Sequence, residues 1–134
     1  DKRMYRLGED VEILYRVTNL RDEEWRVRSL VRIMNIIVEA KSGEDFREVW
    51  VWDWYKGGGT GGPQTLRLKP NESKEVNDIW PQIDYQGTRN NIEDDTQIAA
   101  GTYRISGVLK GIEWDSGPTT RIDTTIAVEI TVTP

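Results

Sequence analysis

The chain contains neither cysteine nor histidine, and these two absences restrict its chemistry more than any residue that is present. Without cysteine, no disulfide contributes to stability, and the redox compartment is left undetermined. Without histidine, a Ser-His-Asp triad cannot form, and a zinc site would consist of carboxylates alone. We therefore expect no enzyme, no cofactor and no metal centre, which leaves binding as the expected function.

Long apolar runs and an excess of positive charge are also missing. No run approaches the roughly 18 apolar residues of a membrane-spanning helix, so we expect no membrane insertion. The net charge of −5 argues against nucleic acid as a partner, because phosphates would be repelled. Four arginines fall within 21–32, but acidic residues at 22–24 interrupt them, and we interpret this stretch as a mixed-charge loop.

The size of the chain suits a single domain, 1–134. With 134 residues and 37% hydrophobic residues, it can bury roughly 68–70% of its unfolded surface. It begins at Asp1 without a signal-type apolar segment and stops at Pro134 directly after a strand-like run. These ends are what we expect of a processed protein or of a domain excised from a longer chain.

Alternation of apolar and polar residues is the dominant pattern, and it is clearest in 121–132. A period of two predicts antiparallel strands that are buried on one face and wet on the other. The same alternation recurs in 10–19 and 101–111. Ten side chains from these three segments are predicted to point inward: Val11, Ile13, Tyr15, Val17, Tyr103, Ile105, Leu109, Ile126, Val128 and Ile130.

About seven strands are expected in all, at 10–19, 31–40, 46–55, 64–69, 72–80, 101–111 and 121–132. The segment Val31–Ala40 has apolar residues at both odd and even positions, which favours a strand buried on both faces, although a short helix fits the same periodicity. Seven short strands separated by turn residues predict an all-β fold, an immunoglobulin-like antiparallel sandwich.

Two connections stand out by composition. Residues 56–63 include five glycines, which predicts a flexible connector; they lack the Gly-Lys-Ser/Thr ending of a phosphate-binding loop. The connection at 84–100 is acidic, with Asp84, Glu93, Asp94 and Asp95, and a solvated loop is favoured there over a calcium site. We expect mobility to peak in 56–63 and in 89–95.

Tryptophan supplies the candidate binding residues. Alternation places Trp50, Trp52 and Trp54 on one strand face, where they form either core or an exposed aromatic stripe; core is favoured for the first two. Trp54 and Tyr55 adjoin the glycine-rich connector and are candidates for partner contact.

Two further tryptophans, Trp25 and Trp114, lie in expected connections at one shared end of the sandwich. Loop tryptophans there could anchor a partner as a binding hot spot. Alternatively, each folds back over its own hydrophobic core, because tryptophan is highly buried on average. The candidate partner-binding residues are therefore Trp25, Trp114, Trp54 and Tyr55, with no catalytic residue among them.

Several short motifs together resemble one family. They are Gly8-Glu9-x-Val11, Val49-Trp50-Val51-Trp52, Leu66-x-Leu68-x-Pro70-Asn71-Glu72-Ser73, Trp80 and Gly101-Thr102-Tyr103. In this order they resemble the intracellular proteinase inhibitor (BsuPI-like) family over nearly the whole chain. Asn71 stands where the family has glycine, Ala100 where it has proline, and 88–99 looks like an insertion.

The resemblance implies an immunoglobulin-like bacterial or archaeal domain that inhibits a subtilisin-type serine protease. It fixes no contact residues. The alternative is an accessory or adhesion module of a larger secreted or surface protein, which the two abrupt ends favour. The first interpretation implies a cytoplasmic protein and the second an extracellular one.

Overall fold

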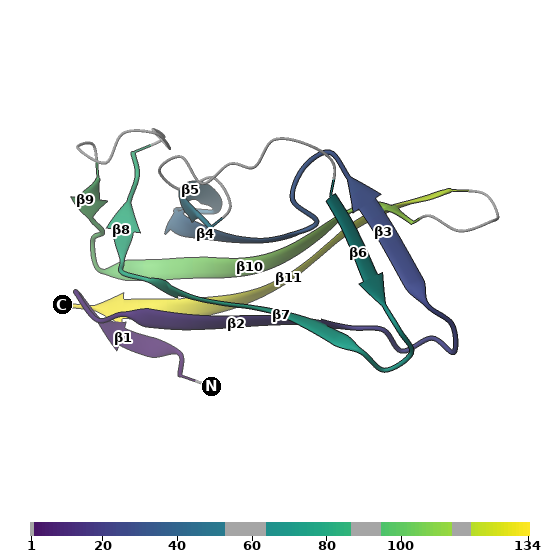
Figure 1. The fold of residues 1–134 in the computed structure, drawn as a ribbon. Helices are drawn as coiled ribbons and strands as arrows, with labels where there is room; N and C mark the ends of the chain where they lie inside the picture. The colour runs from purple at the N-terminus through teal and green to yellow at the C-terminus, as the bar shows by residue number, and fades with distance from the viewer. Residues whose placement is uncertain (1, 53–63, 87–94, 114–118) are drawn as a thin grey trace.

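The computed structural model describes residues 2–52, 64–86, 95–113 and 119–134, and every regular element in these ranges is a strand. The prediction of an all-β sandwich is confirmed (Figure 1). The strands are β1 (Met4–Arg6), β2 (Val11–Thr18), β3 (Trp25–Ser29), β4 (Met34–Ser42), β5 (Asp45–Val51), β6 (Gln64–Leu68), β7 (Ser73–Trp80), β8 (Ile83–Asp84), β9 (Thr96–Gln97), β10 (Gly101–Glu113) and β11 (Thr120–Thr133). The described residues contain no helix long and apolar enough to cross a membrane.

The strands form two layers and a small appendage. In the larger sheet, β10 pairs with β11 along one side and with β4, then β3, along the other; β5 extends β4, and β6 extends β3. The only parallel pair among the described strands joins β1 to the last residues of β11. The second layer consists of β2 and β7. The short pair β8–β9 lies at the end where the chain terminates (Figure 1).

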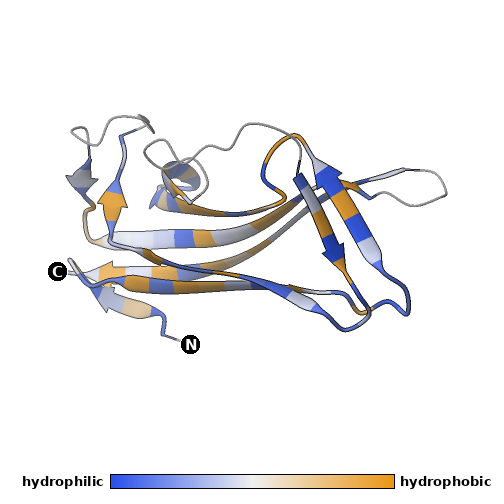
Figure 2. Ribbon diagram, in the orientation of Figure 1, coloured by the Kyte–Doolittle hydropathy of each residue, from blue (hydrophilic) through white to orange (hydrophobic). Residues whose placement is uncertain are grey.

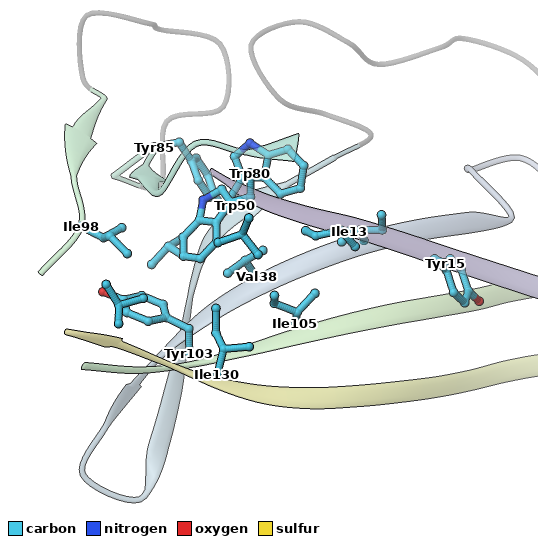
Figure 3. Close-up of a cluster of buried hydrophobic side chains, with 14 of the residues drawn as sticks. Ile13, Tyr15, Val38, Trp50, Trp80, Tyr85, Ile98, Tyr103, Ile105 and Ile130 are labelled. Carbon is cyan, nitrogen blue, oxygen red and sulfur yellow. The ribbon is translucent and has the colours of Figure 1, made fainter. Parts of the chain in front are cut away.

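The main core fills the space between the two layers (Figure 3). Trp80 is fully buried in this core and donates its indole N–H to the carbonyl of Ile83 at 3.0 Å. Its ring lies 5.3 Å from that of Tyr103. A second, smaller cluster of Trp25, Val27, Ile33 and Leu68 lies where β3 and β6 leave the main sandwich.

All seven segments predicted as strands contain one. The doubly apolar run is the strand β4 rather than a helix, and it is central because β10 and β5 flank it. The sequence reasoning missed β1, β3, β8 and β9. The interpretation of 21–32 as a loop is wrong in part, since Trp25–Ser29 forms β3, with Arg26 and Arg28 alternating with buried Trp25 and Val27.

The inward prediction holds for eight of the ten side chains. Six are buried, and Val17 and Leu109 pack partly buried against the core. The prediction is wrong for Ile126 and Val128, which are 66% and 38% exposed. Both share a strand face with buried Ile130, so the alternation is correct. However, no described strand of the second layer covers this part of β11.

Two residues with positive φ lie in connections between strands and form hydrogen bonds to other segments of the chain. Asn71 (φ 63°) takes the left-handed geometry that asparagine tolerates, and its N–H donates to the carbonyl of Asn19 at 2.8 Å. Gln82 (φ 56°) is fully buried and its side-chain amide bonds both to the N–H of Gly8 and to the carbonyl of Arg6. The backbone carbonyl of Gln82 accepts from Ile98 and from the side chain of Gln97.

Candidate functional site

One side of the sandwich is left open between two strand edges. In the described part of the chain, β2 pairs with β7 alone, and β11 pairs with β1 only over Thr131–Thr133. The rest of β11 has β10 on one side and none of the described strands on the other. We call this region the open side and define it by Val11–Thr18 of β2 and Arg121–Glu129 of β11 (Figure 1).

The backbone groups at the edge of β11 follow from the pairing. The N–H of Thr131 donates to the carbonyl of Arg3 at 2.8 Å, so it points away from β10. In an antiparallel pair, alternate residues direct both backbone groups to the same side. The register with β10 is continuous, so Arg121, Asp123, Thr125 and Ala127 also point outward. Within the described residues, these four have no backbone partner.

The edge of β2 is open in the same way. Asn19 donates its N–H to the carbonyl of Glu72 at 3.0 Å and accepts from Asn71, so the odd-numbered residues of this strand face β7. Glu12, Leu14, Arg16 and Thr18 therefore direct their backbone groups away from β7, toward the open side. A two-stranded layer cannot avoid such an edge.

Two cavities lie along the open side, one toward each end. The first, about 350 Å³, has an apolar lining of Tyr5, Val11, Ile13, Leu14, Ile105, Val128 and Ile130, with Lys2, Arg3 and Glu12 at its rim. The second, about 480 Å³, includes Val17, Leu20, Trp25, Leu109 and Ile122. Both are mainly apolar, and Figure 2 shows the alternating hydrophobic bands of β2 and β11 between which they lie.

Between the two cavities, the ring of Tyr15 packs on the backbone of β10. It lies against Gly107, where an added Cβ would come within 2.6 Å of two ring carbons. The absence of a side chain at this position therefore makes room for the tyrosine. Burial raises the pKa of the Tyr15 hydroxyl.

An ion pair lies near each end of the open side. Lys2 forms an ion pair with Glu9, whose other carboxylate oxygen accepts from the N–H of Arg6 at 3.0 Å. The bond from Lys2 is the main reason that the pKa of Glu9 lies below its usual value. At the other end, Arg21 forms a two-pronged ion pair with Glu113. The rim of the open side therefore carries both signs of charge.

Of the predicted partner-binding residues, Trp25 alone lies within the described ranges, and it is part of the lining of the second cavity. Trp25 begins β3, so its assignment to a connection is wrong; its side chain is 9% exposed, and it packs on Val27, Ile33 and Leu68. This supports the alternative in which it covers its own hydrophobic core. Trp54, Tyr55 and Trp114 lie outside the described residues.

The two segments expected as connections meet at one end in their described residues, although part of the first is a strand and not a loop. β3, from the segment between β2 and β4, pairs with the end of β10, and Arg21 bonds to Glu113 there.

The structure shows whether the first two tryptophans of the aromatic strand are core or exposed. Trp50 is buried in the main core, as favoured. Trp52 is partly buried against the same core, and the guanidinium of Arg32 lies 4.7 Å from its ring centre.

The acidic connection differs from its prediction at one residue. Asp84 is 5% exposed and accepts two bonds from Arg47, at 3.3 and 2.5 Å, so it is not part of a solvated acidic loop. Its carboxylate raises the pKa of Arg47. The two segments expected to be most mobile lie outside the described residues, except for Asp95. Glu93 and Asp94 are therefore not described either. Among those described, no three acidic side chains group as metal ligands would.

The open side itself was missed by the sequence reasoning. One signal in the sequence pointed to the open side. The regular alternation in 121–132 covers twelve residues, which is longer than any other predicted strand that could pack over its apolar face. In comparisons with known proteins, no protein family and no curated protein matches this chain.

Proposed function

We propose that this chain is a non-catalytic, protein-binding domain whose open side accepts an extended polypeptide segment along the edge of β2. The observation that carries the proposal is the row of outward backbone groups at Glu12, Leu14, Arg16 and Thr18 above mainly apolar cavities. An unpaired strand edge is a template for another strand, and such additions combine backbone hydrogen bonds with pockets for alternate side chains.

The proposed partner chemistry follows from the lining. A bound strand would present alternate side chains toward Val128, Ile105 and Ile130, which favours apolar residues at every second position. Its other side chains would face solvent beside the mixed charges of the rim.

The proposed fold type within the sandwich class is immunoglobulin-like. Strand β2 pairs with β7, while β4, β10 and β11 lie side by side in the other sheet. These pairings correspond to strands B with E, and to C, F and G, of an immunoglobulin domain. They support the proposal because the strands occupy the same places in the chain order.

The proposed partner class is a subtilisin-type serine protease, on the basis of the resemblance of the aromatic strand and turn motifs to intracellular proteinase inhibitors. The absence of histidine and cysteine from the sequence supports binding over catalysis. An accessory or adhesion module would share the same binding surface but have another partner.

The test is a protease inhibition assay with two matched variants. Leu14→Asp puts a charge in the apolar lining of the first cavity, where Leu14 is 57% exposed, and should weaken inhibition at least about tenfold. Ile79→Asp is the control, because Ile79 is 46% exposed on β7, away from the open edge. Equal inhibition by both variants would refute the binding surface. No inhibition by the wild-type chain at micromolar concentration would refute the protease as partner and favour the accessory module.

A further inference from the structure

The open stretch of β11 carries a positive charge at one end and a negative charge at the other, so two antiparallel copies of it would place opposite charges face to face. It spans Arg121–Glu129, with Thr125 at its midpoint, and begins and ends with opposite charges on the same strand face. Beyond it, β1 covers the edge at Thr131–Thr133. The five odd-numbered residues of this nine-residue stretch, whose backbone groups point away from β10, thus lie symmetrically about one threonine.

We propose that this edge pairs with the β11 edge of a second copy of the chain, antiparallel, about a two-fold axis at Thr125. The inference rests on the proposed function in one respect, that the open side binds polypeptide, but it assigns a different edge and a defined occupant. The two larger sheets would join into one continuous sheet across the axis.

The backbone geometry fits this arrangement. The outward-facing residues are odd-numbered, and in this register each lies opposite another odd-numbered one: Thr125 opposite the second copy's Thr125, and Asp123 opposite the second copy's Ala127. Such facing pairs exchange both hydrogen bonds. At Glu129, Arg3 already donates to the carbonyl at 3.4 Å, but a carbonyl oxygen has a second lone pair for the incoming N–H.

The side chains fit as well. On the outer face, Arg121 lies opposite the second copy's Glu129, and the symmetry makes this ion pair twice. On the inner face, Ile122 lies opposite the second copy's Val128, which is exposed in the single chain. Ile126, 66% exposed, would lie beside the second copy's Thr124. Opposite charges and apolar pairs directly across strands stabilise pairing.

Neighbouring registers lose these pairs. A shift of two residues toward the start of β11 places Arg121 opposite Ala127 and removes both ion pairs. A shift of two residues the other way places Asp123 opposite Glu129, which is repulsive, and Arg121 opposite Thr131, whose edge β1 already occupies. The charges therefore select the register centred on Thr125.

The experiment is sedimentation velocity on the full chain over a range of concentrations, with charge-reversal variants. The wild type should form a dimer that dissociates on dilution. Arg121→Glu and Glu129→Arg should each weaken dimerisation by about tenfold or more, since each turns two attractive pairs into repulsive ones. The double variant restores opposite charges and should recover the dimer. Arg67→Glu, on the exposed face of β6, is the control and should leave dimerisation unchanged.

A second variant separates pairing from folding. Thr125→Pro removes an outward N–H that β10 does not use, and proline is tolerated on an edge strand, so the variant should fold and stay monomeric. A wild-type chain that remains monomeric at every concentration, or a double charge reversal that fails to recover the dimer, would overturn the inference. Either outcome leaves the proposed function to be judged separately, from inhibition by Leu14→Asp.

Discussion

Replacing Gly107 by alanine tests how tightly the two layers meet at the open side. The backbone of Gly107 does not need the left-handed geometry that would exclude alanine. The new methyl group would, however, lie 2.6 Å from Cδ2 and Cε2 of Tyr15 and 3.0 Å from Cγ. Contacts this short are not tolerated, so the tyrosine ring must move outward toward the cavities.

The size of the effect follows from two opposing contributions. Overpacking of a core usually costs about 1–3 kcal/mol. Replacing glycine by alanine in a permitted conformation returns about 0.4–1 kcal/mol, because the unfolded chain loses freedom. We expect Gly107→Ala to lower the free energy of unfolding by about 1–2 kcal/mol, which corresponds to a melting temperature roughly 4–8 °C lower for a domain of this size.

The assay is urea denaturation followed by tryptophan fluorescence, in the wild-type chain and in a Tyr15→Leu background. The smaller leucine leaves room for the methyl group, so the cost of Gly107→Ala should fall by about 1 kcal/mol or more in that background. An equal cost in both backgrounds, within about 0.3 kcal/mol, would refute the contact with Tyr15 as the cause.

Two further predictions concern stability. Asn19→Ala removes the side chain that donates to the carbonyls of Glu23 and Leu68 at 2.8 and 2.9 Å and accepts from the N–H of Arg21, and should cost about 2 kcal/mol in urea denaturation. An unchanged midpoint would contradict this. Burial also raises the pKa of Tyr15 and Tyr103, so the folded chain keeps protons that the unfolded chain releases. Stability should hold below about pH 10 and decrease above it, less so in Tyr15→Phe; a flat profile from pH 9 to 11 would refute the linkage.

Alternation in the sequence predicted where the strands lie and which side chains share a face, because both depend on local geometry. It placed Val11, Ile13 and Tyr15 in the core, and Ile130 likewise. The same reasoning failed for Ile126 and Val128. Whether a strand face is covered depends on how many strands the opposite layer contains, and nothing within β11 encodes that number.

The proposed binding site was harder to predict for a related reason. Trp25 was predicted to lie in a loop, whereas it begins β3. This strand is short and its apolar residues alternate with arginines, so the alternation was too brief to indicate a strand. The open side depends on pairings that are missing, and a missing neighbour leaves little trace in local sequence. The prediction of a solvated acidic loop was wrong for Asp84. Its partner Arg47 is 37 residues away in the sequence and cannot be inferred from composition.

The bonds of Gln82 give the protein a non-covalent cross-link. One buried residue joins the turn after β1, through Gly8 and Arg6, to the segment before β10, through Gln97 and Ile98. These segments are far apart in the sequence but share the hydrogen bonds of one residue, so loosening either would leave buried polar groups of Gln82 unsatisfied. The N-terminal strand, which limits the open stretch of β11, should thus open and close as one cooperative unit with β8 and β9, visible as shared rates of amide hydrogen exchange.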